Sequence, residues 1–376
     1  MADKRQDTTI SLDWILLIAV LCVLAFGLIM VLSSSGIMAE RNFGSKYHFF
    51  QRQFMFACIG LAGMGICAFL PKRFIYQLHY PLLGLSLCAL IITLSPLGVK
   101  VNGASRWISV GPFSVQPMEF AKLSLVLYLS YFFSTKQELV KTFSKGVIPP
   151  FFITALLCCL LLLQPDFGGA AVLAALLFFM CWYGGTRPLY LGGSGLLALG
   201  AGYLLIVQSP YRFRRLLAFL DPFKDADSIS YQLVQSLYAF GSGGFSGQGL
   251  GAGKQKLFYL PEAHNDFIMA VVGEELGFVG MSLFFLLMGT VLFRAFAISY
   301  KQTELRDKFV TFGLALIISL GAVLNLAVVM GAAPPKGIAM PFMSYGGSNL
   351  IAMLLCTGLL LNFSRSHVES EARGRK

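Results

Sequence analysis

The feature that most constrains this chain is the repetition of long apolar runs along its 376 residues. A run of about 20 apolar residues is long enough to cross a bilayer as a helix. We therefore expect an all-α polytopic membrane protein with about ten transmembrane helices, forming a single domain over 1–376. The predicted spans are approximately 14–34, 53–70, 78–95, 117–134, 147–164, 168–185, 189–207, 267–297, 307–331 and 343–363.

The distribution of basic residues predicts the orientation. Sixteen of the 29 Lys and Arg lie in or beside the termini and the loops that an even number of spans places on one side. Basic residues are enriched in cytoplasmic loops. We thus expect a cytoplasmic N-terminus, 1–13, and a cytoplasmic tail, 364–376. The net charge of +11 then reflects topology and attraction to anionic membrane lipid, so no nucleic-acid partner is expected.

The eight cysteines indicate no special chemistry. All of them lie within apolar runs, and none has the spacing of metal ligands or of a disulfide in a loop. We interpret them as small packing residues of membrane helices.

Segment 208–266, between predicted spans seven and eight, is the one long loop, and the topology places it outside the cytoplasm. It contains YRFRRLLAFLDP, a basic amphipathic stretch suited to a membrane surface, and ISYQLVQSLYAF, which predicts a second short amphipathic helix. The glycine-rich GSGGFSGQGLGAGK that follows lacks the lysine–serine ending of a nucleotide-binding loop. A long loop with this apolar content is more typical of a functional segment than of disorder.

Six of the 18 carboxylates lie in or near predicted spans, where charge is costly and marks a site or an internal ion pair. They are Glu119, Asp166, Glu262, Asp266, Glu274 and Glu275. For the adjacent Glu274 and Glu275 we favour internal structural pairing.

Two of these carboxylates allow two interpretations each. Glu119 and Lys122 share a helical face at i, i+3. They could form a structural ion pair, or Lys122 could join Arg106 in a cationic clamp for a lipid-linked phosphate. Asp166, in QPDFG, could cap the next helix or contact substrate.

The stretch PEAHNDF concentrates Glu262, His264 and Asp266 at the entrance to span eight. If the helix begins near Glu262, then Glu262 and Asp266 stack at i, i+4. Two close carboxylates raise the pKa of one of them, which favours a proton acceptor near neutral pH. Acidic residues also suit the first turn of any helix, so a capping role stays open. Further along, the turn before span ten, MGAAPPKGIAMPFMSYGGSNL, adds the cation Lys336 and Ser344.

Several motifs together resemble the SEDS family (shape, elongation, division and sporulation) of membrane glycosyltransferases, which polymerise lipid II into peptidoglycan. They are NGASRWI, QPMEFAK, QPDFG, YQLVQSL, LPEAHNDFI, GEELG and PFMSYGGSN, in this order over essentially the whole chain. Ala263 after the Glu, and PPKG before the last span, are most similar to the division-type FtsW pattern. Asn265, Pro335 and Met343 depart from commoner family residues but spare the charged positions.

The resemblance implies that Asp266 is catalytic, and we assign it as the general base. It also implies that Arg106, Glu119 and Lys122 belong to a polar cluster beside the substrate cavity. Arg52, at the outer end of span two, matches a basic family position, and Asp166 matches the QPD motif, so both are further candidates for substrate binding. From the residues themselves we add candidates for substrate binding: Arg212, Glu262, His264, Lys336 and Ser344.

The same resemblance implies the partners and the location. Lipid II is the expected substrate, a class B penicillin-binding protein of the FtsI type the expected crosslinking partner, and other divisome membrane proteins are expected nearby. The expected location is the bacterial cytoplasmic membrane, at the septum for a division-type protein. No resident cofactor is expected from the residues, because the sequence has no dedicated metal-ligand cluster, but the family is described as assisted by Mg²⁺ or Mn²⁺.

Two other functions also fit ten spans with interior charges: a lipid II flippase, or a non-catalytic scaffold that recruits a penicillin-binding protein. A flippase should carry charge along a central path from both sides. The distinctive clusters here are predicted at one face, which favours catalysis at the outer surface.

Overall fold

Helices make up most of the computed structural model, which describes residues 12–101, 104–111, 113–224, 230–257 and 259–374. The predicted N-terminal segment, 1–13, therefore lies almost wholly outside the described residues. The α-helices are α1 (Trp14–Phe43), α2 (His48–Phe69), α3 (Lys72–Gln77), α4 (His79–Thr93), α5 (Pro117–Thr135), α6 (Ile148–Leu163), α7 (Phe167–Tyr183), α8 (Pro188–Val207), α9 (Pro210–Leu220), α10 (Tyr231–Gly243), α11 (Ile268–Lys301), α12 (Leu305–Val329) and α13 (Gly347–Gly374).

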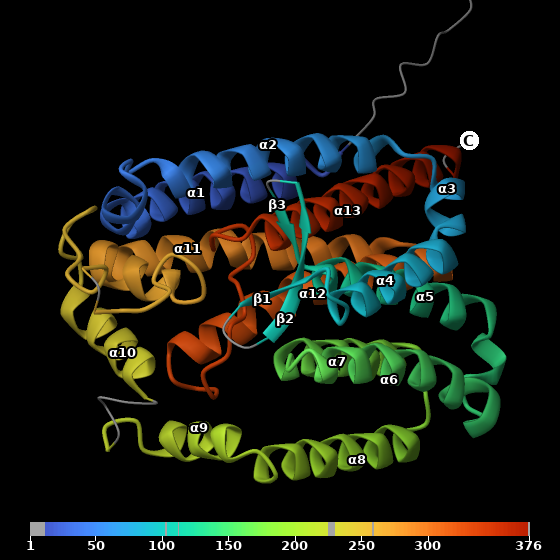
Figure 1. Cartoon of the computed structure of the whole chain (residues 1–376). Coiled ribbons are helices and arrows are strands. Elements are labelled where there is room, and N and C mark those ends of the chain that lie inside the picture. Colours follow the sequence, from blue (N-terminus) through green and yellow to red (C-terminus); the bar gives the residue numbers. More distant parts are fainter. Residues whose placement is uncertain (1–11, 102–103, 112, 225–229, 258, 375–376) are drawn as a thin grey trace, which may run out of the picture.

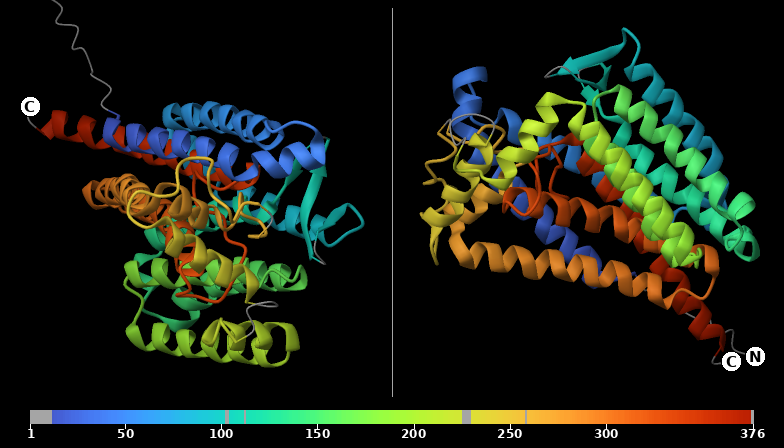
Figure 2. Two further views of the ribbon diagram at one scale, coloured as in Figure 1. Left: turned by 90° about the vertical axis from the view of Figure 1, so that its left-hand side faces the viewer. Right: turned by 90° about the horizontal axis from the view of Figure 1, so that it is seen from below.

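The long helices lie side by side in layers (Figure 1). The helices α1, α2 and α13 form one layer, and α11 and α12 lie beside them, with α12 also packed on α5. The pair α6 and α7 follows, and α8 lies outermost, where only Leu191 of its residues is buried. The beginning of α1 and the end of α13 meet at one end of the bundle (Figure 2), where the backbone N–H of Asp13 donates to Ser364 Oγ at 3.3 Å.

The predicted fold class is confirmed. Each of the ten predicted spans overlaps a helix, and seven of the described helices are long and apolar enough to cross a membrane. How many helices do cross stays a prediction. The boundaries differ in places: α1 continues to Phe43, α2 begins at His48, and α13 runs through the predicted cytoplasmic tail as far as Gly374.

A small antiparallel sheet, which the sequence did not predict, lies between α4 and α5. Its strands β1 (Gly98–Val101), β2 (Ala104–Val110) and β3 (Phe113–Val115) pair in the order β1-β2-β3. Ile108 is opposite both Gly98 and Val115, so β2 is the central strand. The sheet carries Arg106, which it holds near the start of α7.

The long loop 208–266 forms the two helices that its sequence predicted, α9 and α10. The helix α10 packs against α11 and, more loosely, against α12. Its buried residues include Leu233, Val234 and Ala239, so one apolar face is covered by the bundle. The loop is therefore folded against the membrane helices.

The helix α11 is interrupted at Gly277, which has φ 60° and ψ −154°. The glycine-rich part of the long loop uses this break. The N–H groups of Phe278 and Val279 donate to the carbonyls of Gly244 and Phe245 at 3.0 and 3.1 Å. A Cβ at position 277 would lie 2.3 Å from the nitrogen of Gly247, so this approach requires glycine twice over, for its φ and for the space.

Glu274 and Glu275 fasten the next part of the loop. Glu274 accepts the backbone N–H of Lys254 at 2.8 Å. Glu275, whose side chain is fully buried, accepts the amine of Lys256 at 2.6 Å and the hydroxyl of Ser33 at 2.5 Å. The predicted internal pairing of the two glutamates thus exists, although their partners come from the loop and from α1.

The buried pair between Lys256 and Glu275 generates a stability prediction. In Lys256→Met, Glu275 is left charged and unpaired, and loss of one member of a buried pair costs about 3–5 kcal/mol. We expect a clear drop in the thermal unfolding temperature of the detergent-purified protein. The double variant Lys256→Met/Glu275→Gln should recover part of the loss, because the unpaired charge is gone.

The matched control is Lys254→Met, because Lys254 is exposed and contributes only its backbone N–H to Glu274. Equal destabilisation by Lys254→Met and Lys256→Met would show that the ion pair does not hold the loop.

Candidate active site

The PEAHND stretch forms a turn, not the start of a helix. The helix α11 begins at Ile268, and Glu262 has a φ of 55°, which interrupts any helical path after Pro261. The N–H of Asn265 donates to the carbonyl of Glu262 at 3.0 Å, and its side-chain amide donates to the Glu262 carboxylate. The predicted helical stacking of Glu262 on Asp266 is therefore wrong.

Asp266 is fixed from the opposite side by α12. The side-chain amide of Asn325 donates to the carbonyl of Asp266 at 2.8 Å and to the carbonyl of Ile338 at 2.6 Å. Gly337 lies directly against the Asp266 carboxylate, because a Cβ there would be 2.8 Å from Oδ2. One buried amide thus joins the turn that carries Asp266 to the segment that carries Lys336.

The surroundings of Asp266 raise the pKa of its carboxyl to about 7. The main cause is burial, which disfavours the charged form, and the negative charge of Glu262 adds to it, whereas the Arg106 guanidinium opposes it. Glu262 therefore acts on Asp266 by charge, as predicted, although the two are not stacked on a helix. A carboxyl with this pKa can accept and release a proton near neutral pH.

His264 packs against aromatic rings. Its ring lies 4.7 Å from that of Phe49 and 5.7 Å from that of Tyr345, measured between centroids. Its carbonyl accepts the N–H of Tyr345 at 3.0 Å. Burial lowers the pKa of His264, and Glu262 partly opposes this, so the ring is expected to be neutral at pH 7. We assign His264 to fixing the turn.

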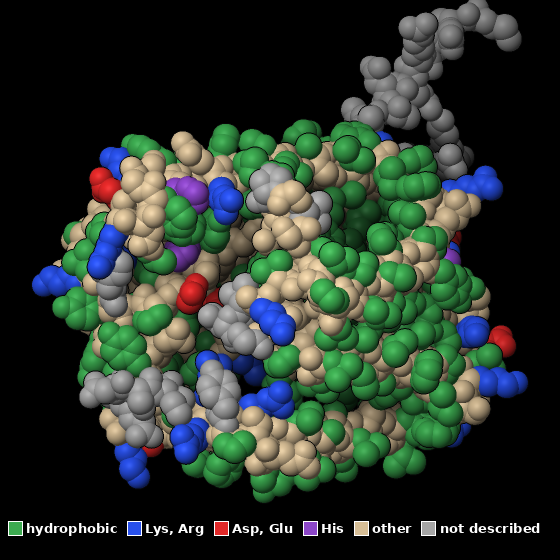
Figure 3. Space-filling view, viewed as in Figure 1, with side chains coloured by type: hydrophobic (Ala, Val, Ile, Leu, Met, Phe, Trp, Pro, Cys, Tyr) green, Lys and Arg blue, Asp and Glu red, His purple; other side chains and the backbone are tan. Residues whose placement is uncertain are grey.

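Three cations gather around the first turn of α7. The amine of Lys336 lies 4.6 Å and the guanidinium of Arg212 lies 5.6 Å from the ring of Phe167. Arg106 lies 3.9 Å from Asp166 and donates to the carbonyl of Pro165. Burial lowers the pKa of Lys336, and Asp166 opposes this. Figure 3 shows basic side chains gathered around a hollow in this face, above α9.

The two interpretations of Asp166 are both compatible with its position. Its carboxylate accepts the N–H of Gly169 at 3.0 Å and caps α7. The same carboxylate faces Arg106, so it also orients one of the cations. The capping role is confirmed, and contact with a substrate stays a prediction.

Other predicted site residues lie elsewhere. Lys122 and Glu119 form a buried ion pair of 2.7 Å, and Asn349 of α13 donates to the same glutamate at 2.9 Å. This is the structural pairing that the sequence allowed. Ser344 is buried, and its hydroxyl accepts the N–H of Met340 at 2.8 Å, so we assign it to the turn. Arg52 is exposed on α2.

Four residues of this site were not singled out from the sequence: Phe167, Arg215, Asn325 and Gly337. Arg215 was quoted only as part of the basic amphipathic stretch YRFRRLLAFLDP. The guanidinium of Arg215 donates to the carbonyl of Pro335 at 3.4 Å. Asn325 carried a usable signal, because it is the one amide in the apolar run 309–330. A polar group at such depth needs a partner inside the protein. Phe167 and Gly337 carried no signal in the sequence, because their roles depend on neighbours that are distant in the sequence.

Fold and site together define a multi-pass membrane protein with a titratable carboxylate beside a cluster of cations at the bundle end that carries the long loop. The family model described as cell cycle protein, covering FtsW, RodA and SpoVE, matches residues 13–369. The chain belongs to this family, which confirms the resemblance seen in the sequence.

Individual relatives agree. A probable peptidoglycan glycosyltransferase FtsW of Trichlorobacter lovleyi is 44% identical over 94% of this chain and 93% of its own length. Stage V sporulation protein E of Bacillus subtilis is 38% identical over 94% of this chain and 97% of its own. Among solved structures, a chain of a peptidoglycan synthase complex that coordinates polymerization and crosslinking is similar with a TM-score of 0.80 and 31% identity, covering 95% of this chain and 98% of that one. The rod shape determining protein RodA of Thermus thermophilus gives 0.72 and 30%, with the same coverage.

The raised pKa of Asp266 predicts how stability depends on pH. Its folded-state pKa of about 7 lies above the ordinary value of 3.8, so between these pH values the folded chain binds the proton more tightly than the unfolded chain. This carboxyl therefore contributes less stability as pH rises from about 4 to about 7. Asp266→Asn removes that dependence, and we expect it to unfold at a higher temperature than wild type at pH 8 but not at pH 4.

The measurement is thermal unfolding of both proteins in the same detergent at the two pH values. Since other titrating groups are shared, only the difference between the two proteins matters. A difference that does not change with pH would mean that Asp266 has an ordinary pKa in the folded chain.

Proposed function

We propose that this chain is a peptidoglycan glycosyltransferase that polymerises lipid II at the outer face of the cytoplasmic membrane. The observation that carries the proposal is the placement of Asp266, with a pKa of about 7, on the same face as Arg106, Arg212 and Lys336. The names of the relatives support the reaction class.

The reaction needs a base and a stabiliser of negative charge. Asp266 takes the proton from the 4-hydroxyl of the acceptor sugar as that oxygen attacks the anomeric carbon of the donor. The new glycosidic C–O bond forms while the bond from that carbon to the diphosphate oxygen breaks. The departing polyprenyl diphosphate carries the negative charge, and Arg106, Lys336 and Arg212 stabilise it.

The structure changes which cations are assigned to the diphosphate. Lys122, the residue suggested by spacing, is neutralised by Glu119 inside the bundle, so we replace it with Lys336. No described contact joins Arg52 to this cluster. Arg52 is an exposed basic residue of α2, and we assign it no role at the diphosphate. Arg106 and Arg212 remain as predicted.

An apolar groove beside the cations suits the lipid part of the substrate. It has a volume of about 310 Å³, lies between α7 and α12, and is lined by Lys336 among its residues. Ala171, Ala175, Leu320 and Leu324 contribute to its walls. A polyprenyl chain in this groove would bring its diphosphate to Lys336.

No step of this mechanism is assigned to a divalent metal. Among the described residues no group of three or more His, Cys, Asp and Glu side chains could hold an ion, so the protein's own donors do not fit a resident site. The expectation that Mg²⁺ or Mn²⁺ assists stays a prediction, and no step is assigned to it.

The partners and the orientation belong to the same proposal. We infer that Asp266 faces outward, that both termini are cytoplasmic, and that a class B penicillin-binding protein of the FtsI type crosslinks the product at the septum, together with other divisome membrane proteins. Asp13 pairs with Arg294 at the end of the bundle that would face the cytoplasm.

The decisive test is polymerisation of purified lipid II by the purified protein, with and without its penicillin-binding partner. Loss of a general base costs about 10²–10⁴-fold in rate, so we expect Asp266→Asn to lose activity by that factor. Near-normal polymer formation by this variant would remove Asp266 from the chemistry. In proteoliposomes, movement of lipid II without polymer would favour the flippase instead.

The rate should also depend on pH as Asp266 titrates. Only the deprotonated carboxylate accepts a proton, so the wild-type rate is expected to rise through about pH 7. Glu262→Gln removes a negative neighbour, which lowers the pKa of Asp266 and moves the rise to lower pH. The control Glu138→Gln changes an exposed carboxylate in a different loop and should leave the profile in place. An unmoved profile in Glu262→Gln would show that another group titrates.

A further inference from the structure

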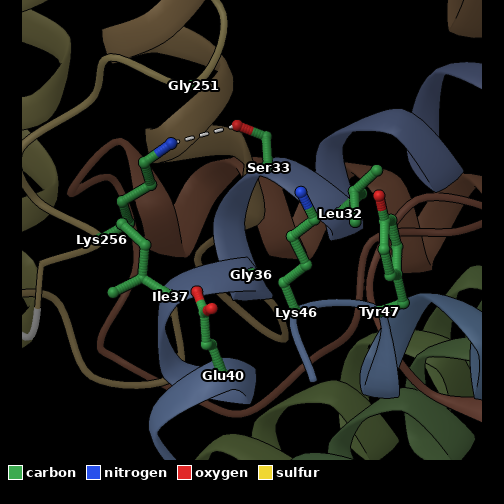
Figure 4. Close-up of a pocket in the computed structure, with 9 residues that line it drawn as sticks. All are labelled: Leu32, Ser33, Gly36, Ile37, Glu40, Lys46, Tyr47, Gly251 and Lys256. Carbon is green, nitrogen blue, oxygen red and sulfur yellow. Dashed lines mark hydrogen bonds between the residues drawn. The ribbon is translucent and has the colours of Figure 1, made fainter. Parts of the chain in front are cut away.

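A second cavity, with a volume of about 250 Å³, lies between the end of α1 and the long loop. Its walls include Ser33 and Glu40 of α1, Lys46 and Tyr47 of the turn into α2, and Lys256 of the loop (Figure 4). We call it the Glu40–Lys46 cavity. None of these residues takes part in the reaction described above.

The floor of this cavity is rigid and electrically neutral. The amine of Lys256 bonds to Glu275 at 2.6 Å and to Ser33 at 3.2 Å, and its side chain is only 3% exposed. The N–H of Gly251 donates to the same glutamate at 2.9 Å. Because these groups bond to one another, the floor contributes no net charge. The charge that a ligand would meet comes from Glu40 and Lys46.

Above the floor, the cavity presents one anion and one cation that are held apart. Figure 4 shows the Glu40 carboxylate and the Lys46 amine projecting into the same space from different segments. The ion pairs of the described residues do not join them, and the Lys46 amine instead lies 5.1 Å from the ring of Tyr47. A ligand that carries both an amine and a carboxylate could pair with both.

The cavity is connected along the chain to the turn that carries Asp266. Its wall residue Lys256 belongs to the same loop as Asp266, and its wall residue Tyr47 immediately precedes α2, whose Phe49 packs on His264. A peptide of five residues spans at most roughly 17 Å when extended. The His264–Phe49 contact is the path along which such a peptide, attached to a sugar near Asp266, would run toward this cavity.

We propose that the Glu40–Lys46 cavity binds the peptide stem of the substrate, through its free carboxylate at Lys46 and its free amine at Glu40. This inference rests on the proposed function, because it names a part of the same lipid-linked substrate. The cavity thus selects for the stem while Asp266 and the cations act on the sugar and the diphosphate.

The test compares two substrates on the purified full-length protein: the polyprenyl-linked disaccharide with its complete peptide stem, and the same molecule without the stem. Partly exposed ion pairs are worth up to about 1 kcal/mol, which is about a fivefold change in affinity. We expect Glu40→Gln and Lys46→Met to raise the KM for the stem-bearing substrate roughly three- to fivefold. With the stem-free substrate, kcat and KM should equal those of wild type.

The matched control is Lys100→Met, which removes the same charge from an exposed site on β1 and should change neither substrate's kinetics. The stem-free substrate also reports whether each variant is folded. Equal effects on both substrates, or no effect on either, would overturn the stem site. Wild-type protein that polymerises neither substrate would instead refute the proposed function.

Discussion

Two adjacent glutamates attach the long loop to the helix bundle. Glu274 and Glu275 lie in the part of α11 that precedes the break at Gly277, and their carboxylates bond to the backbone and to Lys256 of the long loop. Inside a membrane protein, such groups must be satisfied by the chain itself. The long loop supplies those partners, and the same bonds fix the glycine-rich part of the loop against α11.

The position of Asp266 follows from this attachment and from a second one. The loop reaches Asp266 from one side, and Asn325 holds its backbone from the other, together with that of Ile338. The carboxyl is thereby enclosed enough for its pKa to rise to about 7, while Lys336 of the neighbouring segment stays beside Phe167. The segments that carry Asp266 and Lys336 are joined by one set of contacts to the backbone, so the separation of the two residues does not depend on flexible side chains alone.

Much of the fold could be predicted because its signals are local. Every predicted span corresponds to a helix, and the amphipathic patterns near 211–222 and 229–240 correspond to α9 and α10. The β-sheet was missed because its strands are short and carry no long alternating pattern. The predicted span beginning at 267 agrees with the start of α11 at Ile268. The alternative of a helix beginning near Glu262 fails, because acidic residues after a proline resemble a helix start and only the positive φ of Glu262 shows otherwise.

By itself, the sequence determined the membrane class, the helices and the family, and it singled out Asp266 as the candidate carboxylate, since apolar runs and short motifs depend on neighbouring residues. Only the tertiary structure decided which charges meet. Spacing suggested Lys122 for the site, but Glu119, which also accepts from Asn349, neutralises it inside the bundle. Lys336, Arg212 and Phe167 instead come together from three separate segments. Pairing across such distances depends on how the helices pack, and the order of residues along one segment does not specify it.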